Sequence, residues 1–242
     1  MIEARDLAKR FEGVDAVRDV SFVAPDGAIT GLLGPNGAGK TTTLRMISTL
    51  VVPTQGCARV DGLDGKADPL AVRARIGMLS DARGLYGRLT ARENIAYYGA
   101  LRGLEPAQVD AAINRLAEML DMGALMSRRT DGFSQGERMK VAIARTLVHD
   151  PPNVMLDEPS NGLDVMTTRN LREVIKRLRE AGKCVLFSSH VMQEVSALCD
   201  NIVIVARGAV VASGSAPELL AASGCTNLED AFVRLTGAED AA

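Results

Sequence analysis

The chain has few aromatic residues and no excess of positive charge, and both shortages argue against a nucleic-acid-binding protein. Aromatic residues make up 3% of the 242 positions and tryptophan is absent, too little for a surface on which single-stranded bases stack. Lysine and arginine number 28 against 30 acidic residues, so the formal net charge of −2 gives no attraction for a polyanion. We therefore expect no nucleic acid among the partners.

Cysteine pairs, metal-binding histidines and long apolar runs are also lacking. The four cysteines contain no C-x-x-C pair, and the two histidines show no metal-ligand spacing. Reduced cysteines in a cytosolic compartment are therefore expected. Because the N-terminal segment is charged throughout, we expect no signal peptide, and no run of about 18 apolar residues predicts a membrane span. If the protein works at a membrane, another chain must provide the pore.

Short apolar runs bounded by glycine recur along the chain and predict strands that are buried on both faces. These runs are residues 20–25, 28–34, 75–80, 153–159, 184–190 and 201–208. Helical patterns lie between several of them. Apolar residues in 171–178 follow i, i+3, i+4, i+7 spacing, and Gly182 is placed to end that helix. Alternating strands and helices predict a layered α/β domain with a mostly parallel sheet.

One segment, residues 88–133, contains no convincing strand. Pro106 stands where a first-turn proline would, and apolar residues from 109 to 120 follow at helical spacing. We therefore predict a helical lobe that is inserted into the α/β core. The predicted parts are a core of residues 1–87 and 134–212, an inserted helical subdomain of residues 88–133, and a small C-terminal tail of residues 213–242 with helices at 217–222 and 228–235.

The sequence GPNGAGKTT matches the phosphate-binding pattern G-x-x-x-x-G-K-[ST], and it stands between an apolar strand and a helical run. Glycines let such a loop wrap its backbone N–H groups around phosphates, and the following helix adds its positive N-terminal end. We expect Lys40 to reach the β- and γ-phosphates and the Thr41 hydroxyl to bind Mg²⁺. A glycine turn that fits the pattern by chance is the disfavoured alternative. The predicted nucleotide-binding loop consists of Gly34, Pro35, Asn36, Gly37, Ala38, Gly39, Lys40, Thr41 and Thr42.

A second apolar run, VMLDEP, ends in two acids. Asp157 is placed to hold Mg²⁺, and Glu158 is placed to act as the general base that polarises the attacking water. The alternative is a pair of solvated acids at a strand end, which the presence of the phosphate loop disfavours. A GTPase would need the guanine-reading pattern N-K-x-D, and the nearest sequence, GKAD at 65–68, lacks the asparagine.

Several motifs follow the phosphate loop in order along the chain. They are FSQGE at 133–137, LDEP at 156–159, SNGLD at 160–164 and His190 after the run CVLFSS. Together they resemble the nucleotide-binding subunits of ABC transporters, over essentially the whole chain. The resemblance implies a P-loop NTPase core with a mostly parallel sheet, an N-terminal antiparallel β region and an inserted α-helical subdomain. It also implies ATP and Mg²⁺ as ligands, and catalytic roles for Lys40, Glu158 and His190.

The resemblance assigns a function to FSQGE, which is a second glycine-containing turn in addition to the phosphate loop. In such ATPases the Ser-x-Gly corner of one subunit caps the γ-phosphate held by the phosphate loop of another, so that two subunits enclose two ATP molecules. Ser134, Gly136 and Glu137 would form this corner, although FSQGE departs from the commoner Leu-Ser-Gly-Gly-Gln. Taken alone, Ser134 and Glu137 also fit a capping box at the start of a helix, and both roles can hold at once.

Three further residues receive roles from the same resemblance. Phe11 would stack on adenine, His190 would contact the γ-phosphate, and Asp164 would link the two sites across the dimer. Each has a structural alternative. These alternatives are a strand-edge core residue for Phe11, a hydrogen-bonded core histidine for His190 and a helix N-cap for Asp164.

Residues 76–95 carry Asp81 where most relatives have a glutamine. An aspartate can hold Mg²⁺ through water but cannot donate a hydrogen bond, so we expect Asp81 to serve coupling to a partner more than chemistry. The alternative is an aspartate that caps a local turn. With the runs KVAIARTLVHDP, SNGLDVMTTRNLR and SSHVMQEVSALCD, this region resembles the sodium-exporting branch of ABC-2-type exporters.

This branch implies an ATPase subunit that dimerises with a second copy on binding ATP and powers export through a separate polytopic membrane permease. The expected location is the cytoplasmic face of the cell membrane, and the candidate cargo is the sodium ion. The same features suit exporters of drugs or other small molecules. A soluble ABC ATPase not coupled to transport would carry a duplicated cassette or a long coiled coil, and 242 residues leave no room for either. A P-loop kinase would not explain the Ser-x-Gly corner.

Overall fold

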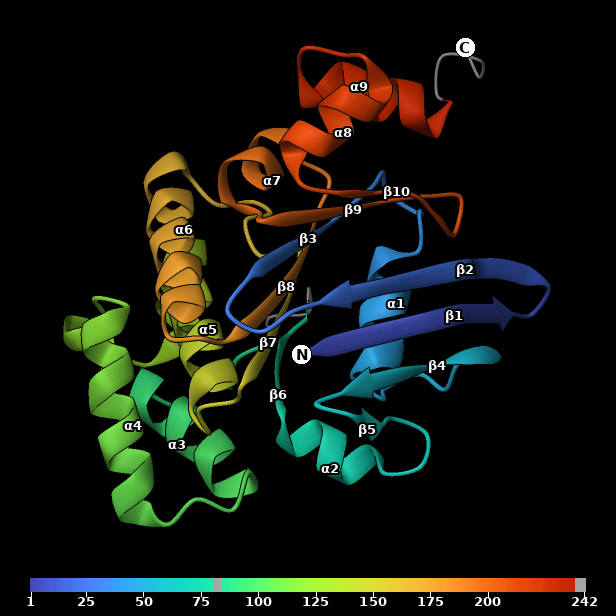
Figure 1. Ribbon diagram of the computed structural model, residues 1–242. Helices are drawn as coiled ribbons and strands as arrows, with labels where there is room; N and C mark the ends of the chain where they lie inside the picture. The colour runs from blue at the N-terminus through green and yellow to red at the C-terminus, as the bar shows by residue number, and fades with distance from the viewer. Residues whose placement is uncertain (81–83, 238–242) are drawn as a thin grey trace.

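The computed structural model describes residues 1–80 and 84–237, which form a ten-stranded sheet flanked by helices (Figure 1). The strand order across the sheet is β5-β4-β1-β2-β10-β9-β3-β8-β7-β6. The strands are β1 (Ile2–Phe11), β2 (Val14–Ala24), β3 (Ile29–Leu33), β4 (Gln55–Val60), β5 (Leu63–Asp64), β6 (Ile76–Leu79), β7 (Asn153–Asp157), β8 (Cys184–Ser189), β9 (Asn201–Ala206) and β10 (Ala209–Gly214). The helices are α1 (Lys40–Ile47), α2 (Pro69–Ala74), α3 (Ala91–Leu101), α4 (Pro106–Met119), α5 (Gln135–Leu147), α6 (Val165–Glu180), α7 (Met192–Leu198), α8 (Ala216–Ser223) and α9 (Leu228–Thr236), with 3₁₀ turns η1 (Gly123–Leu125) and η2 (Thr130–Gly132). Within these described ranges, no helix is long and apolar enough to cross a bilayer.

The central strands run parallel and are buried on both faces. β3 pairs in parallel with β8 and β9, and β7 pairs in parallel with β6 and β8. Every residue of β3 and of β7 is buried, as their apolar runs predict. Parallel strands bring their carboxyl ends to one edge of a sheet. The segments after β3, β7 and β8 therefore meet, and they carry the phosphate loop, the two acids and His190.

The N-terminal part of the sheet is antiparallel, as the resemblance implies. β1 pairs antiparallel with both β2 and β4, and β4 pairs antiparallel with β5. β10 joins the two parts, because it runs antiparallel to β9 and pairs in parallel with β2 at Ala209 and Asp19. The sheet is thus mixed, and the predicted parallel arrangement holds for β3, β6, β7, β8 and β9.

Helices α3 and α4 occupy the segment that was expected to be helical, and α4 begins at Pro106, whose missing N–H suits a first turn. Ile95 of α3 and Ile113 of α4 belong to the same buried apolar cluster as Leu33 and Val185 of the sheet. The helical segment therefore packs on the sheet through a shared core. The limits of a separate subdomain at residues 88 and 133 stay a prediction.

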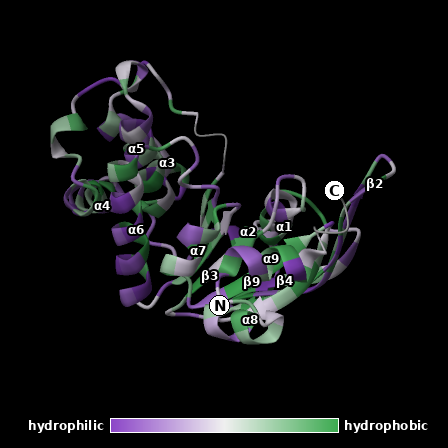
Figure 2. Ribbon diagram, turned by 90° about the horizontal axis from the view of Figure 1, so that it is seen from above, coloured by the Kyte–Doolittle hydropathy of each residue, from purple (hydrophilic) through white to green (hydrophobic). Residues whose placement is uncertain are grey.

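Helix α6 confirms its predicted amphipathic pattern. Most of the helix is hydrophilic, as Figure 2 shows, and it ends before Gly182, whose φ is 78°. Its buried residues are Leu171, Val174, Ile175 and Leu178, the residues of the i, i+3, i+4, i+7 pattern.

Helices α8 and α9 lie beside α7 (Figure 1) and match the helices expected at 217–222 and 228–235 to within one residue at each end. Leu219 and Phe232 are buried in the apolar cluster that also contains Val195 of α7. The described part of the C-terminal tail is therefore packed on the core.

Candidate functional site

The loop between β3 and α1 is shaped by glycines that a larger residue could not replace without strain. Gly37 and Gly39 have φ values of 80° and 103°, in the left-handed region. A Cβ on Gly34 would lie 2.3 Å from the carbonyl oxygen of Val205, and a Cβ on Gly39 would lie 2.6 Å from that of Ala16. The glycine pattern therefore serves a tight turn packed closely against neighbouring backbone.

A cleft of about 620 Å³ lies along this loop. Its size suits a small-molecule ligand such as a nucleotide. Segments far apart in the sequence meet in it, because β2 and the loops after β3, β7 and β8 all contribute. The lining residues are Val14, Asp15, Ala16, residues 36–42, Glu158, Asn161 and His190.

Lys40 places a buried ammonium group in this cleft. Its Nζ donates hydrogen bonds to the carbonyl oxygens of Gly34 at 2.7 Å and Pro35 at 3.1 Å. The same nitrogen forms an ion pair of 3.1 Å with Glu158 Oε1. A lysine ammonium is a compact charge with three donors, so a phosphate group in the cleft can replace Glu158 while the carbonyl contacts remain.

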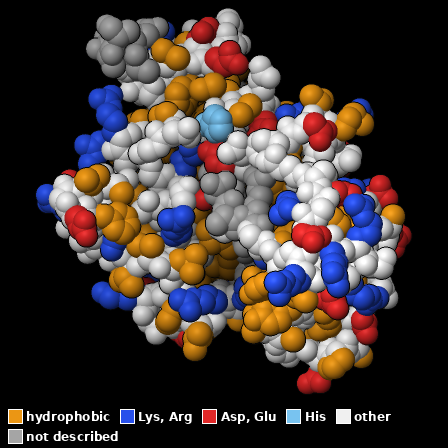
Figure 3. Space-filling model, turned by 180° about the vertical axis from the view of Figure 1, so that it is seen from behind, with side chains coloured by type: hydrophobic (Ala, Val, Ile, Leu, Met, Phe, Trp, Pro, Cys, Tyr) orange, Lys and Arg blue, Asp and Glu red, His pale blue; other side chains and the backbone are white. Residues whose placement is uncertain are grey.

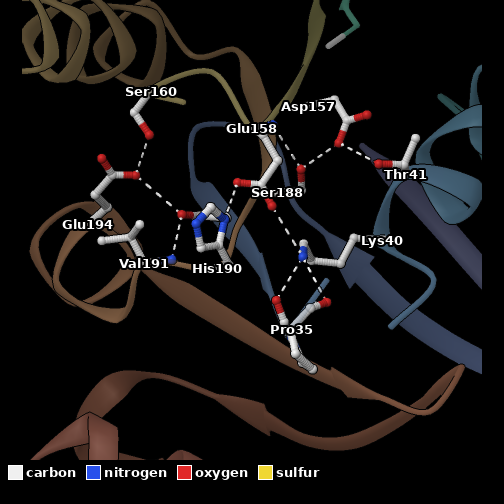
Figure 4. Close-up of polar contacts among 12 residues, drawn as sticks. Pro35, Lys40, Thr41, Asp157, Glu158, Ser160, Ser188, His190, Val191 and Glu194 are labelled. Atoms are coloured by element: carbon white, nitrogen blue, oxygen red, sulfur yellow. Dashed lines mark hydrogen bonds and ion pairs between the residues drawn. The ribbon is translucent and has the colours of Figure 1, made fainter. Parts of the chain in front are cut away.

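Asp157, the last residue of β7, is 1% exposed. Its Oδ1 accepts hydrogen bonds from Thr41 Oγ1 at 3.1 Å and from Ser188 Oγ at 2.7 Å (Figure 4). Its Oδ2 is buried, and no group in the described part of the chain donates a hydrogen bond to it. A buried carboxylate oxygen without a donor would be satisfied by a hard cation. The Thr41 hydroxyl and the Asp157 carboxylate therefore fit the expected Mg²⁺ site.

Glu158 lies between Lys40 and His190 (Figure 4). Its Oε1 pairs with Lys40, and its Oε2 lies 2.8 Å from His190 Nδ1. The Glu158 backbone N–H donates to Ser188 Oγ at 3.0 Å, and its φ is 45°. This left-handed backbone costs a non-glycine residue about 1 kcal/mol or more and is typical of functional sites. A carboxylate held this way at a cleft can orient a water molecule and accept its proton.

Phe11 ends β1 at the hairpin that leads to the cleft. Its partner across the hairpin is Val14, which lines the cleft, although Phe11 itself does not. The ring is 44% exposed, and Lys9 Nζ lies 5.0 Å from its centroid. This exposure excludes the alternative of a core residue. Stacking of Phe11 on adenine stays a prediction.

The corner at Ser134 is the N-terminus of α5, and the expected capping box is present. Ser134 Oγ accepts from the Glu137 N–H at 3.2 Å, and the Ser134 N–H donates to Glu137 Oε2 at 2.8 Å. The Ser134 N–H also lowers the pKa of the Glu137 carboxyl, and Arg128 pairs with it at 2.8 Å. Gly136 lies against Thr167, because a Cβ there would be 2.9 Å from Thr167 Oγ1. None of these residues lines the chain's own phosphate-loop cleft.

Asp164 is the N-cap of α6, as its structural alternative predicted. Its carboxylate accepts from the Thr167 N–H at 2.9 Å and from Thr167 Oγ1 at 2.7 Å, and these bonds lower the Asp164 pKa. The loop before it touches the Ser134 corner, since Gln135 Nε2 donates to the Asn161 carbonyl oxygen at 3.3 Å. A role for Asp164 across a dimer stays a prediction.

A protein-family model described as ABC transporter matches residues 17–161. The chain belongs to the ABC transporter family. It is 46% identical to the ABC transporter ATP-binding protein NatA of Bacillus subtilis (strain 168), over 90% of this chain and 91% of that protein. It is 36% identical to the daunorubicin/doxorubicin resistance ATP-binding protein DrrA of Streptomyces peucetius, over 92% of this chain and 68% of that protein. A solved ATP-binding subunit of an ABC transporter superposes with a TM-score of 0.89 at 28% identity, covering 98% of this chain and 99% of that one.

These similarities confirm the family that the ordered motifs predicted, and they confirm the P-loop NTPase fold. The chain is therefore an ATP-binding subunit of an ABC transporter and an ATPase. The roles of its individual residues stay predictions.

In this ABC ATPase, one predicted site residue is not described by the structure, and one residue at the site was not predicted. Asp81, expected near the metal and the partner, lies outside the described residues. Ser188 belongs to none of the sequence motifs, although it donates a hydrogen bond to Asp157 Oδ1 and accepts one from the Glu158 N–H. The available signal was the pair Ser188 and Ser189 at the end of an otherwise apolar strand, where buried hydroxyls need partners.

Proposed function

We propose that this ABC ATPase works as a homodimer in which the Ser134 corner of each copy completes the cleft of the other. The supporting observation is that the Ser134 corner does not line the cleft of its own chain, yet it contacts a residue that does. Gln135 contacts Asn161, and Asn161 lines the cleft. The capping box uses the N–H groups of Ser134 and Glu137. The N–H groups of Gln135 and Gly136 have no acceptor within α5, so these two suit a γ-phosphate brought by a second copy.

Within each site, the geometry supports separate roles for the residues that bind ATP and the residues that hydrolyse it. Phe11 would stack on adenine, residues 34–42 would hold the phosphates, and Lys40 would neutralise their charge. Glu158 would take a proton from the attacking water, and His190 would hold Glu158 and contact the γ-phosphate.

Thr41 and Asp157 would hold Mg²⁺, with the buried Asp157 Oδ2 as the supporting observation. The ion would neutralise charge on the phosphate oxygens. Asp81 would contact this ion only through water and would serve coupling to the permease more than chemistry.

A separate membrane permease is proposed to take up the energy of dimer closure at the cytoplasmic face of the membrane. Leu50, Leu70 and Leu101 are exposed and border a groove of about 580 Å³ that also contains Arg73 and Arg102. Figure 3 shows hydrophobic side chains gathered in patches between charged ones on one face of the molecule. Exposed apolar side chains gathered around a groove support contact with another protein.

Export of sodium ions is the proposed activity of the complex, supported by the branch resemblance of residues 76–95. Drug export is the second candidate, supported by the 36% identity to a daunorubicin/doxorubicin resistance protein. Vesicles that contain the chain and its permease distinguish the two: we expect ATP-dependent sodium movement, and movement of daunorubicin without sodium would favour the second candidate.

Dimerisation can be tested without the permease. We expect ATP with Mg²⁺ to convert the Glu158→Gln variant from monomer to dimer in sedimentation velocity, because bound ATP is then hydrolysed slowly. Adding Ser134→Arg should abolish the dimer. Ser215→Arg is the matched control, since Ser215 caps α8 with the same kind of capping box to Glu218. A Glu158→Gln chain that stays monomeric with saturating ATP contradicts the proposal, as does equal loss of the dimer in both arginine variants.

A further inference from the structure

Glu194 of α7 joins the two loops that carry Glu158 and His190 (Figure 4). Its side chain is buried, with the residue 7% exposed. Its Oε2 accepts a hydrogen bond from Ser160 Oγ at 2.6 Å and another from Ser189 Oγ at 3.2 Å. Glu194 does not line the nucleotide cleft. A buried carboxylate with these contacts is a structural link between loops, held by charge-assisted hydrogen bonds.

The linked residues stand next to the groups that the proposed function uses. Ser160 lies two residues after Glu158, and Ser189 directly precedes His190. Ser189 Oγ also accepts from the Val191 N–H at 3.0 Å, so the backbone on both sides of His190 is held. A shift of either loop would therefore change the contact between Glu158 Oε2 and His190 Nδ1, which is 2.8 Å long.

The position of Glu194 is itself fixed by packing. Its helix neighbours Val195 and Leu198 are buried in the apolar cluster that includes Leu33 and Phe187 of the sheet. A group that is anchored on a packed helix can hold the loops that it contacts in a defined geometry.

We propose that Glu194 is a positioning residue that sets Glu158 and His190 in their reactive arrangement. The proposal rests on the proposed function, because it takes these two residues as the hydrolytic pair. Ser160 also lies in the loop that reaches Asn161 and the Ser134 corner. Glu194 therefore connects the arrangement of the hydrolytic pair to the segment that would face a second copy.

Substitution of Glu194 should lower the rate of ATP hydrolysis without weakening ATP binding. Glu194→Ala removes both hydrogen bonds, and a misplacement of about 1 Å at a reacting group can cost about 100-fold in rate, so we expect kcat to fall at least tenfold. The dissociation constant for ATP should stay within about twofold, because residues 34–42 hold the phosphates. Glu194→Gln keeps an acceptor oxygen at the same reach and should recover most of kcat.

The test uses the purified full chain, steady-state phosphate release and equilibrium titration with a fluorescent ATP analogue. Glu218→Ala is the control, because Glu218 also accepts from a serine hydroxyl, that of Ser215 at 2.8 Å, but away from the cleft. Adding Glu194→Ala to a Ser160→Ala, Ser189→Ala double variant should cost little more, since the residue acts through these hydroxyls.

Three outcomes would overturn the proposal. They are an unchanged kcat in Glu194→Ala, a parallel loss of ATP affinity and kcat, and a full further loss when Glu194→Ala is added to the serine variants. If Glu194→Ala does not fold, Ser160→Ala decides by itself: we expect slower hydrolysis at unchanged ATP affinity, and normal hydrolysis overturns the proposal. Wild-type hydrolysis and ATP-driven dimerisation of Glu158→Gln do not depend on this result, so the proposed function can stand when the inference fails.

Discussion

Lys40 and Glu158 contact each other across the cleft, with Nζ 3.1 Å from Oε1 and side chains only 5% and 13% exposed. Lys40 begins α1 and Glu158 follows β7, so the ion pair joins two separate segments of the site. Removing one member of such a pair leaves the other charge poorly solvated. Variants at either position must therefore be measured for ATP binding and for folding as well as for rate.

Glu158→Gln should separate ATP binding from hydrolysis. Glutamine keeps the shape of the side chain but cannot accept a proton from water, so we expect hydrolysis to fall by about 10²- to 10⁴-fold. ATP binding should survive, because losing the carboxylate leaves Lys40 available to phosphate. Phosphate release and nucleotide titration measure the two effects. Glu93→Gln is the control, since Glu93 belongs to a capping box at the start of α3. Near-normal hydrolysis by Glu158→Gln would exclude Glu158 as the base.

Mixed dimers test whether each site is built from two chains. Lys40→Ala disables the phosphate loop and Ser134→Arg disables the corner, so each variant alone should be inactive. An equal mixture should recover at most about a quarter of wild-type activity, because half of randomly formed dimers are mixed and each holds one intact site. Phosphate release against mixing ratio gives the result. A Ser134→Arg chain that hydrolyses ATP at the normal rate would leave the corner only a helix cap.

Arg128 should offset the negative charge of Glu137 at the Ser134 corner. Its Nη1 lies 2.8 Å from Glu137 Oε1, and its guanidinium lies 5.1 Å from the Phe133 ring centroid. Without this cation, Glu137 would present an uncompensated carboxylate to the phosphates of a second copy. We expect Arg128→Gln to weaken ATP-driven dimerisation about two- to fivefold, as suits a partly exposed pair.

The added substitution Glu137→Gln should restore dimerisation of Arg128→Gln, since it removes the repelling charge. Sedimentation in the Glu158→Gln background measures both variants, and salt should reduce the difference between them. An Arg128→Gln defect that Glu137→Gln does not relieve would show that Arg128 acts only by holding the local fold.

Local motifs were predictable from the sequence because their chemistry lies within a few consecutive residues. The phosphate loop needs its glycines at fixed spacing, and Asp157 and Glu158 stand at the end of one apolar strand, so the sequence predicts the position of both. Strand order could not be obtained this way. β3 pairs with β8 and β9, more than 150 residues later in the chain, and nothing local specifies that contact.

Other features were missed for identifiable physical reasons. Alternation does not predict β1 because the pattern breaks: Asp6 has a φ of 49°, and the pairing shifts register between Ala4 and Leu7. Glu194 belongs to no phosphate-binding motif, and only burial and the positions of Ser160 and Ser189 reveal it. Residues that act through other residues leave a weaker pattern than residues that touch a ligand.

His149 should make the fold less stable in mild acid. It follows α5, and burial together with the positive charge of Arg102 lowers its pKa from 6.5 to about 4. Its Nε2 donates to the Ile76 carbonyl oxygen at 3.1 Å, while its Nδ1 is buried without a hydrogen-bond partner in the described part of the chain. Asp150 and Lys183 add smaller effects of opposite sign. The folded protein therefore resists protonation of this ring.

The lower pKa of His149 in the folded protein decides how stability changes with pH. Between about pH 6.5 and pH 4 the unfolded chain binds a proton at His149 that the folded chain does not, so the free energy of unfolding falls as pH falls through this range. His149→Gln can keep a donor to Ile76 but cannot titrate, so its free energy of unfolding should change less over the same range. Urea denaturation of both proteins at a series of pH values measures the contribution as the difference between two curves, in which shared carboxylate titrations cancel. Parallel curves would mean that His149 is protonated equally well in both states, and that its burial does not limit stability.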